Sequence, residues 1–332
     1  MTALRSIDVV TIGESMVLFQ PSPEGTIPYA SLFASSVGGA ESNVALALSR
    51  LGKTSRWISR LGDDPFGKMI LSTLAGEGVD VSHVITDDQH PTAVFFKESK
   101  GYGDPNVYYY RKNSAASYFS KEDISSSWFL GAKHLHVTGI TPALGLKTAE
   151  MVSEAMKRAK EQGLTISFDP NIRKKLWRED EARETLLPMV ALCDLFIPGI
   201  HEVKLLVGER ANDVDYAKAC QHLGPQMVAM KLGSEGAYMQ FGNEFHREPA
   251  YRVNHIVDTV GAGDAFCAGL LSVLLDEEDP FNIVTLRRSV SQAAKRAAAM
   301  GALATQFKGD WEGSPTLQEI NSLITGDQYT TR

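Results

Sequence analysis

Residues 258–269, DTVGAGDAFCAG, have the types and spacing that phosphoryl chemistry needs. Gly261, Ala262 and Gly263 are three small residues placed where a strand-rich region passes into an apolar helix. Small residues let the backbone approach a ligand, and the free amides of a helix N-terminus attract an anion such as phosphate. Asp264 would repel a bound phosphate, but its carboxylate suits a base that deprotonates an attacking hydroxyl. The stretch therefore predicts a phosphate site beside a base, the simpler alternative being a glycine-rich helix cap.

A second glycine-containing stretch, GDDPFGK at residues 62–68, matches a phosphate-binding loop as far as its lysine. Position 69 is methionine, so the hydroxyl that would hold Mg²⁺ is missing. Asp63 and Asp64 would also place two negative charges against the phosphates. We interpret this stretch as a turn followed by a helix with Pro65 at its start.

The overall composition restricts the class of protein. The chain has 332 residues, of which 43% are hydrophobic and 22% charged, enough for one large α/β domain with a sizeable core. The net charge of −7 and the absence of a basic run argue against a nucleic-acid partner. No segment approaches the roughly 20 apolar residues of a membrane span. Because no such segment is present, we expect no membrane partner. Cysteines are few and widely spaced, which favours reduced thiols and a cytoplasmic protein.

Strand and helix patterns alternate along most of the chain. Strands are expected near residues 7–12, 55–59, 134–138, 164–168, 194–198 and 227–231, with β-rich residues again at 237–254. Helices are expected near residues 43–51, 66–76, 146–162, 202–206, 215–223, 262–275 and 286–304. Such alternation predicts an α/β fold in which helices cover a parallel sheet.

Two segments interrupt this alternation. Residues 14–37 contain no long helical pattern, and residues 92–112 have the pattern of two strands joined by a Gly/Asp/Pro turn. We interpret them as a small β lid inserted into the main domain, the alternative being an ordinary surface hairpin. Because a thin sheet cannot bury both of its faces alone, we expect a homo-oligomer formed through the lid.

Two segments, VGGAESNVALALSRLG at residues 37–52 and DTVGAGD at residues 258–264, resemble the signatures of the ribokinase-like, PfkB-type carbohydrate kinases. The likeness runs through essentially the whole chain, 1–332, as a single kinase domain. Within the family the chain is most similar to 2-keto-3-deoxygluconate kinases, through GGAESN, YYYRK, HLHVTGITPAL, DPNIR and GDWEGSP. The resemblance implies a three-layer αβα sandwich with a mainly parallel central sheet and a β lid that closes over the sugar. It also implies ATP and Mg²⁺, and leaves a monovalent cation open.

The resemblance further implies which residues bind the two substrates. The sugar set is Gly39, Ala40, Glu41, Ser42, Asn43, Phe95, Tyr109, Arg111, Asn171, Arg173, Asp264 and Asp310. The nucleotide set is Lys231, Gly233, Ser234, Glu235, Gly236, Ala237, Gly261, Ala262, Gly263 and Ala298. Gly261, Ala262, Gly263 and Asp264 would be catalytic.

The chain departs from the family pattern in three places. Phe95 and Ala298 stand where relatives can have Tyr and Asn. Where the family has an Asn-Glu-x-Glu metal pattern, this chain has Gly199, Ile200, His201 and Glu202, so only the last glutamate is kept. Glu202 is therefore the candidate metal ligand, and nucleotide phosphates and water would otherwise hold Mg²⁺.

Two arginines indicate the kind of sugar. A sugar acid needs cations for its carboxylate, and Arg111 on the lid and Arg173 after a strand can supply charge-assisted hydrogen bonds. The two arginines therefore favour a sugar acid, and the resemblance to 2-keto-3-deoxygluconate kinases implies ATP-dependent phosphorylation of 2-keto-3-deoxy-D-gluconate to 2-keto-3-deoxy-6-phosphogluconate. A neutral-sugar kinase of the fructokinase or ribokinase type and a non-catalytic sugar-binding regulator are the alternatives.

Overall fold

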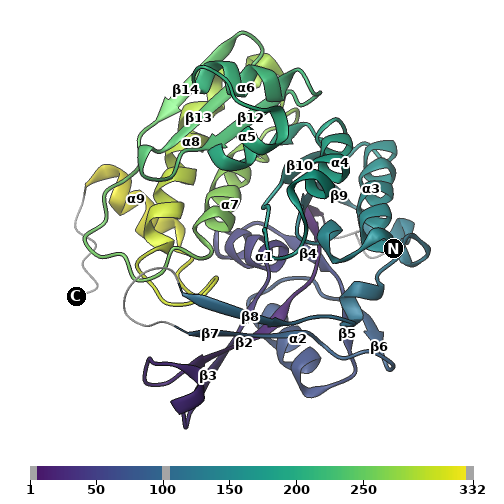
Figure 1. Ribbon diagram of the computed structural model, residues 1–332. Coiled ribbons are helices and arrows are strands. Elements are labelled where there is room, and N and C mark those ends of the chain that lie inside the picture. Colours follow the sequence, from purple (N-terminus) through teal and green to yellow (C-terminus); the bar gives the residue numbers. More distant parts are fainter. Residues whose placement is uncertain (1–5, 99–104, 327–332) are drawn as a thin grey trace.

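A computed structural model describes residues 6–98 and 105–326 of the chain. Within this part, the main sheet has eight strands in the order β14-β13-β12-β11-β10-β9-β1-β4 (Figure 1). The strands are β1 (Ile7–Ile12), β4 (Ser55–Ile58), β9 (Ala132–Thr138), β10 (Thr165–Asp169), β11 (Leu195–Phe196), β12 (Met227–Lys231), β13 (Ala237–Phe241) and β14 (Glu244–Glu248). Neighbouring strands are parallel from β4 to β12, whereas β13 and β14 add an antiparallel hairpin at one edge.

Helices cover both faces of this sheet. One hydrophobic cluster joins the sheet to α3 (Leu146–Glu161), α4 (Glu179–Val190), α5 (Ile200–Val207) and α6 (Asp213–Gln221). A second cluster joins the other face to α1 (Ala40–Arg50), α7 (Ala262–Leu274) and α8 (Ile283–Ala304), and α9 (Leu317–Thr325) packs onto α8. The expected three-layer αβα sandwich with a mainly parallel central sheet is confirmed.

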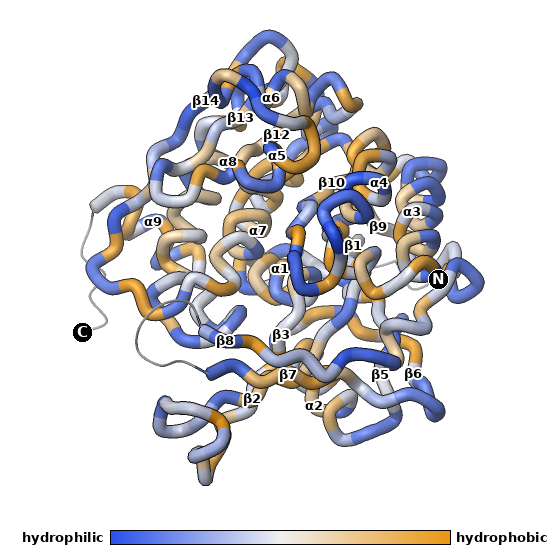
Figure 2. The backbone as a smooth tube through the Cα atoms, viewed as in Figure 1, coloured by the Kyte–Doolittle hydropathy of each residue, from blue (hydrophilic) through white to orange (hydrophobic). Residues whose placement is uncertain are grey.

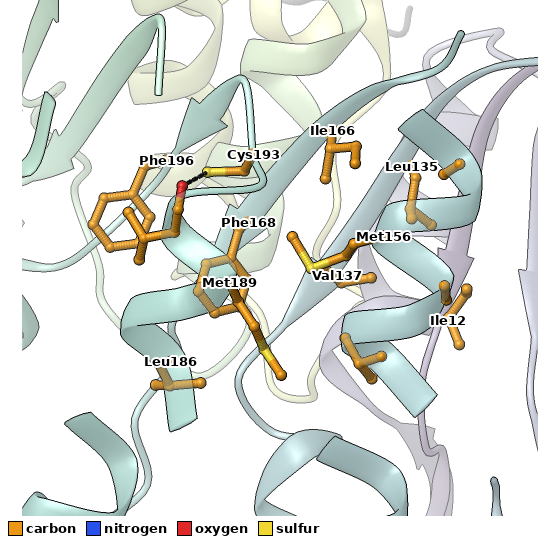
Figure 3. Close-up of a cluster of buried hydrophobic side chains, with 14 of the residues drawn as sticks. Ile12, Leu135, Val137, Met156, Ile166, Phe168, Leu186, Met189, Cys193 and Phe196 are labelled. Atoms are coloured by element: carbon orange, nitrogen blue, oxygen red, sulfur yellow. Dashed lines mark hydrogen bonds between the residues drawn. The ribbon is translucent and has the colours of Figure 1, made fainter. Parts of the chain in front are cut away.

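Strand β10 shows why the sheet has two different faces. Ile166 and Phe168 point from it into the cluster that contains Met156 of α3 and Met189 of α4 (Figure 3). Burying a side chain such as Phe168 stabilises the fold by about 1.5–3 kcal/mol. Figure 2 shows the matching pattern on α3, whose outward side is hydrophilic. Because side chains alternate along a strand, Asp169 points to the opposite side, at the carboxyl end of β10.

A separate four-stranded sheet lies across one end of the main body, below α1 in Figure 1. It has the order β3 (Phe33–Gly38), β2 (Met16–Pro21), β7 (Val94–Glu98) and β8 (Asn106–Tyr110). Helix α2 (Pro65–Gly76) packs against it, and β5 (Arg60–Gly62) pairs with β6 (Ile85–Asp87) nearby. The expected lid segments, 14–37 and 92–112, contribute the four strands, although residues 99–104 lie outside the described residues.

Several elements differ from the expectation. Helix α1 starts at Ala40 rather than residue 43, and the β-rich pattern expected to reach residue 254 ends as a strand at Glu248. Helix α4 was not predicted because Pro188 interrupts its apolar pattern. Helix α9 was also not predicted, because it is short; it begins with a capping box between Thr316 and Glu319.

The stretch at residues 62–68 is the expected turn and helix start. The Asp64 carboxylate accepts hydrogen bonds from the amides of Gly67 at 2.8 Å and Thr92 at 2.7 Å, and α2 begins at Pro65. The Asp64 carboxylate therefore already accepts the hydrogen bonds that these amides could otherwise donate to a phosphate.

Candidate active site

A cavity of about 380 Å³ lies at the carboxyl ends of β10 and β12, between the small sheet and the start of α7. Ligands of open α/β sheets bind at this end of the strands. From the expected sugar set, its wall includes Gly39, Ala40, Asn43, Phe95, Tyr109, Arg111, Asn171, Arg173, Asp264 and Asp310. From the expected nucleotide set, it includes Lys231, Gly261 and Gly263. Segments far apart in the sequence thus meet around one cavity.

The loop before α7 requires glycine. Gly261 is the N-cap of α7 and has a φ of 78°, in the left-handed region. A Cβ at this position would lie 1.9 Å from the carbonyl oxygen of Asp310. A Cβ built on Gly263 would lie 3.6 Å from Lys231 Nζ, so this ammonium group lies beside the first turn of the helix. The helix N-terminus and the ammonium group together favour an anion here.

Asp264 is buried in the first turn of α7. Its Oδ2 accepts a hydrogen bond of 2.8 Å from Asn43 Nδ2. Burial raises the pKa of Asp264 to about 7, although this hydrogen bond favours the ionised form. A carboxylate with a pKa near neutrality is suited to take and release a proton.

Lys231 forms an ion pair with Asp169, whose Oδ2 lies 2.5 Å from Lys231 Nζ. Cys267 Sγ also donates to this oxygen, at 3.4 Å. The side chain of Glu202 is buried near both Asp169 and Lys231. Its pKa is raised first by burial and then by the negative charge of Asp169. The ammonium group of Lys231 is therefore paired with Asp169, and its charge also counteracts the rise in the pKa of Glu202.

Each carboxylate oxygen of Glu202 already accepts one hydrogen bond from the backbone. Oε1 accepts from the amide of Ile172 and Oε2 from the amide of Gly199, both at 2.6 Å. In residues 6–98 and 105–326 no group of three or more His, Cys, Asp or Glu side chains is placed to hold a metal ion. This donor set fits Mg²⁺ that is held mainly by phosphate oxygens and water, with Asp169 and Glu202 nearby.

The sugar side of the cavity carries two arginines in different surroundings. Arg111 forms an ion pair with Glu14 and lies over the Tyr109 ring, 5.5 Å from its centroid. Its Nε is buried and has no hydrogen-bond partner among the described residues. Arg173 is exposed on the wall and makes no ion pair within the described chain.

Asp310 closes the cavity near Gly38. A Cβ on Gly38 would lie 2.4 Å from Asp310 Oδ2. Asp310 Oδ1 is buried without a hydrogen-bond partner in the described part of the chain. Burial raises the pKa of Asp310 to about 6, against the opposing effect of Lys97. A ligand hydroxyl would satisfy the free oxygen.

Glu41 and Ser42 do not line the cavity, contrary to the expectation for the segment 39–43. Glu41 Oε1 accepts hydrogen bonds from Thr138 Oγ1 at 2.8 Å and Thr141 Oγ1 at 3.0 Å, in the body of the protein. Ser42 Oγ donates to the carbonyl oxygen of Gly39 at 3.0 Å. The helical turn explains this, because consecutive residues of α1 point in different directions.

Part of the expected nucleotide set also lies outside the cavity wall: Gly233, Ser234, Glu235, Gly236, Ala237, Ala262 and Ala298. Residues 233–236 lie in the connection between β12 and β13, and Ala237 is the first residue of β13. Ala298 lies one helical turn before Gly301, and a Cβ on Gly301 would be 3.3 Å from the carbonyl oxygen of Ala262. This side of α8 therefore meets the start of α7.

Three charged wall residues were not in the expected sets: Glu14, Lys97 and Asp169. Each had a signal in the sequence. Glu14 and Asp169 follow the apolar runs of predicted strands, and Lys97 lies two residues after Phe95 in a predicted lid strand, so the two side chains point to the same face.

A larger hollow of about 950 Å³ lies between the end of α8 and α9. It contains none of the expected site residues. Its one arginine, Arg50, pairs with Glu77 and donates to the carbonyl oxygens of Glu312 and Ser314. We therefore assign the chemistry to the smaller cavity.

A glycine loop at a helix N-terminus, next to a buried carboxyl group and a lysine, defines a phosphotransferase-type site on a ribokinase-like fold. The model of the pfkB family of carbohydrate kinases matches residues 6–317. This chain belongs to that family, as its two signature segments indicated. No helix in the described residues is both long and apolar enough to cross a membrane.

Individual relatives match over nearly their whole length. The chain is 41% identical to the 2-dehydro-3-deoxygluconokinase of Bacillus subtilis (strain 168), covering 97% of each chain. It is 33% identical to the 2-dehydro-3-deoxygluconokinase of Thermoproteus tenax, covering 96% of this chain and 94% of that one. Among solved structures, a putative ribokinase II from E. coli in complex with ATP and Mg²⁺ has a TM-score of 0.85 and 28% identity, covering 96% and 99%.

Proposed function

We propose that this chain transfers the γ-phosphoryl group of ATP to the C6 hydroxyl of 2-keto-3-deoxygluconate, also called 2-dehydro-3-deoxygluconate. The observation that carries the proposal is the position of Asp264, a buried carboxyl group hydrogen-bonded to Asn43 at the N-terminus of α7. The two relatives named 2-dehydro-3-deoxygluconokinase support this choice of substrate.

Asp264 acts as the base. Its carboxylate takes the proton of the C6 hydroxyl, the hydroxyl oxygen bonds to the γ-phosphorus, and the bond to the bridging oxygen breaks to release ADP. With a pKa near 7, Asp264 is ionised in a substantial fraction of molecules at neutral pH.

The loop and Lys231 bind the phosphate groups. The amides of the first turn of α7, around Gly261 and Gly263, stabilise the charge on the transferred group. Lys231 lies beside Gly263 and supplies a positive charge there. Mg²⁺, when bound through phosphate oxygens and water, offsets the negative charge of the leaving ADP.

The carboxylate of the sugar acid binds to the arginines. Arg173 makes no ion pair in the described residues, so its charge is available, and Arg111 keeps a donor without a partner at Nε. A neutral sugar would leave Arg173 without a charged partner and would offer no carboxylate to the Nε of Arg111. The small sheet acts as a lid that excludes water from this side and limits hydrolysis of ATP.

The test is ADP production measured with a panel of sugar acids and neutral sugars. We expect 2-keto-3-deoxygluconate to be preferred over fructose and ribose, and Asp264→Asn to lower turnover by about 10²- to 10⁴-fold while ATP still binds. The matched control is Asp63→Asn, an acidic residue in the turn before α2, which should keep full turnover. Preference for a neutral sugar would overturn the role of the arginines, and normal turnover in Asp264→Asn would overturn the base.

We also propose that two copies of the chain associate through the outer face of the lid. Phe96 stacks on Phe19 with ring centroids 5.3 Å apart, and Phe33 and Tyr110 meet it edge-on at 5.8 and 5.6 Å. Tyr110 is 66% exposed, so this aromatic face is open to a partner. Light scattering should show Tyr110→Glu as a monomer, whereas Phe245→Glu, at a 63% exposed aromatic on β14, stays oligomeric. A wild-type monomer would contradict the proposal.

The cytosol is the proposed location. Cys193, Cys220 and Cys267 are buried free thiols, which suits a reducing compartment.

A further inference from the structure

Lys97 connects the small sheet to the phosphate loop. It lies on β7, two residues after Phe95 on the same inner face, and both side chains line the cavity. Its ammonium group forms an ion pair with Asp258, and the two side chains are only 6% and 8% exposed. An ion pair this deeply buried depends on both partners, because either charge alone would be left without solvent.

Asp258 is the first residue of the segment that carries the phosphate loop and the base. Its Oδ1 accepts a hydrogen bond of 3.1 Å from the amide of Val260. The amides of Val257 and Asp258 both donate to the carbonyl oxygen of Thr305, at 2.8 and 3.1 Å. The start of this segment is thus attached to three places: its own next turn, the end of α8 and the small sheet.

Asp310 adds a second carboxyl group to the cavity wall that Lys97 lines. Lys97 favours the ionised form of Asp310, whereas the charge of Asp258 opposes it. The carbonyl oxygen of Asp310 also packs against Gly261. Lys97 therefore contacts segment 258–264 through Asp258 and lines the same cavity as Asp310.

We infer that Lys97 is a positioning residue that couples the sugar pocket to the phosphate loop through Asp258. A sugar in the cavity holds β7 in place, Lys97 then holds Asp258, and Asp258 keeps segment 258–264 in the shape that brings Asp264 to the reacting phosphate. This inference rests on the proposed function of the two sites. Lys97 itself takes no part in the proton or phosphoryl transfer.

Coupling of this kind is measurable as a change in affinity. When one ligand orders the contacts that the other needs, each ligand tightens the other by the same factor, typically about 5- to 150-fold. We expect the wild-type chain to bind a non-hydrolysable ATP analogue more tightly in the presence of 2-keto-3-deoxygluconate, by a factor in this range. Calorimetric titrations with and without the sugar acid give the ratio of the two Kd values.

Three single variants and one double variant test whether the Lys97–Asp258 ion pair carries the coupling. Lys97→Met should reduce the ratio of Kd values to about one or two, because the coupling factor is lost. Asp258→Asn should do the same, although its side-chain oxygen can still accept from the amide of Val260. Lys97→Arg keeps the charge and should restore most of the coupling. The double variant Lys97→Met/Asp258→Asn should be no worse than either single one, since both remove the same contact.

Lys175→Met is the matched control. Lys175 Nζ donates to the carbonyl oxygen of Val107 on β8 at 3.0 Å, so it also joins the body to the small sheet but does not touch segment 258–264. We expect this variant to keep the wild-type ratio. Steady-state kinetics should agree, with kcat lowered and the KM for ATP raised in Lys97→Met but not in Lys175→Met.

The inference is wrong if Lys97→Met keeps the wild-type ratio, if Lys175→Met loses it equally, or if the wild-type chain shows no coupling. Circular dichroism and melting curves show whether each variant is folded, and Asp258→Asn and Lys97→Arg carry the test if Lys97→Met is not. ADP production by the wild-type chain tests the proposed function separately. A chain that phosphorylates the sugar acid without coupling overturns only the inference, whereas one that does not phosphorylate it overturns the proposed substrate.

Discussion

Replacing Asn43 by leucine should move the pH dependence of the reaction. Asn43 Nδ2 donates to Asp264 Oδ2 at 2.8 Å, and this hydrogen bond favours the carboxylate. Leucine has a similar size and cannot donate, so the ionised base loses a partner inside the protein. The pKa of Asp264, already raised to about 7 by burial, should rise further.

The size of the change follows from the strength of one buried hydrogen bond to a charge. Such a bond contributes about 1.5–3 kcal/mol, and 1.36 kcal/mol corresponds to one pH unit. The acid limb of kcat/KM should therefore move upward by about one to two pH units. Since the base works only when ionised, the variant is slower than wild type at pH 6.5 and approaches it in alkaline buffer.

Initial rates of ADP release at low sugar concentration, from pH 5.5 to 10, measure this limb in the free enzyme. Ser42→Ala is the matched control, because Ser42 is the preceding residue of α1 but donates to the carbonyl oxygen of Gly39 and does not reach Asp264. Its acid limb should stay with wild type. An Asn43→Leu protein that is folded and keeps the wild-type acid limb, or moves it downward, would refute the reasoning.

Three further predictions follow from individual contacts. Gly261→Ala should abolish turnover, because its Cβ would lie 1.9 Å from the carbonyl oxygen of Asp310. The control is Gly52→Ala, at a residue with a similar φ of 80° but nothing within 4 Å of the added Cβ. It should lose only about 1–2 kcal/mol of unfolding free energy and keep its activity. Burial raises the pKa of Glu41 to about 7 from an ordinary 4.5, so this group's contribution to stability is present below pH 4.5 and lost as pH rises through 7. Glu41→Gln should remove this loss, about 3 kcal/mol between pH 4.5 and 8, in denaturant titrations. Arg173→Gln should raise the KM for the sugar acid about 10- to 100-fold with little change for a neutral sugar, and an unchanged KM would exclude a contact with the carboxylate.

The sequence alone was sufficient for the fold class and for the residue types of the phosphate loop. Short apolar runs indicate buried strands, and apolar residues with a period of 3.6 indicate helices. Both patterns are local properties of the sequence, so the strands and most helices could be predicted from their own residues. The same holds for Gly261 and Asp264, because a helix N-terminus with small residues and an acid is a local arrangement. Resemblance to a family supplied the sugar-binding segments.

Only the tertiary structure decided how these groups act on one another. The pKa of Asp264 depends on burial and on Asn43, which is 221 residues away in the chain. The ion pairs Arg111–Glu14, Lys231–Asp169 and Lys97–Asp258 likewise join separate segments. Glu41 lies one residue from Ala40, yet it points into the body and not into the cavity. The sequence specifies which charges exist, but burial and distance set their strength, and both arise only when the chain has folded.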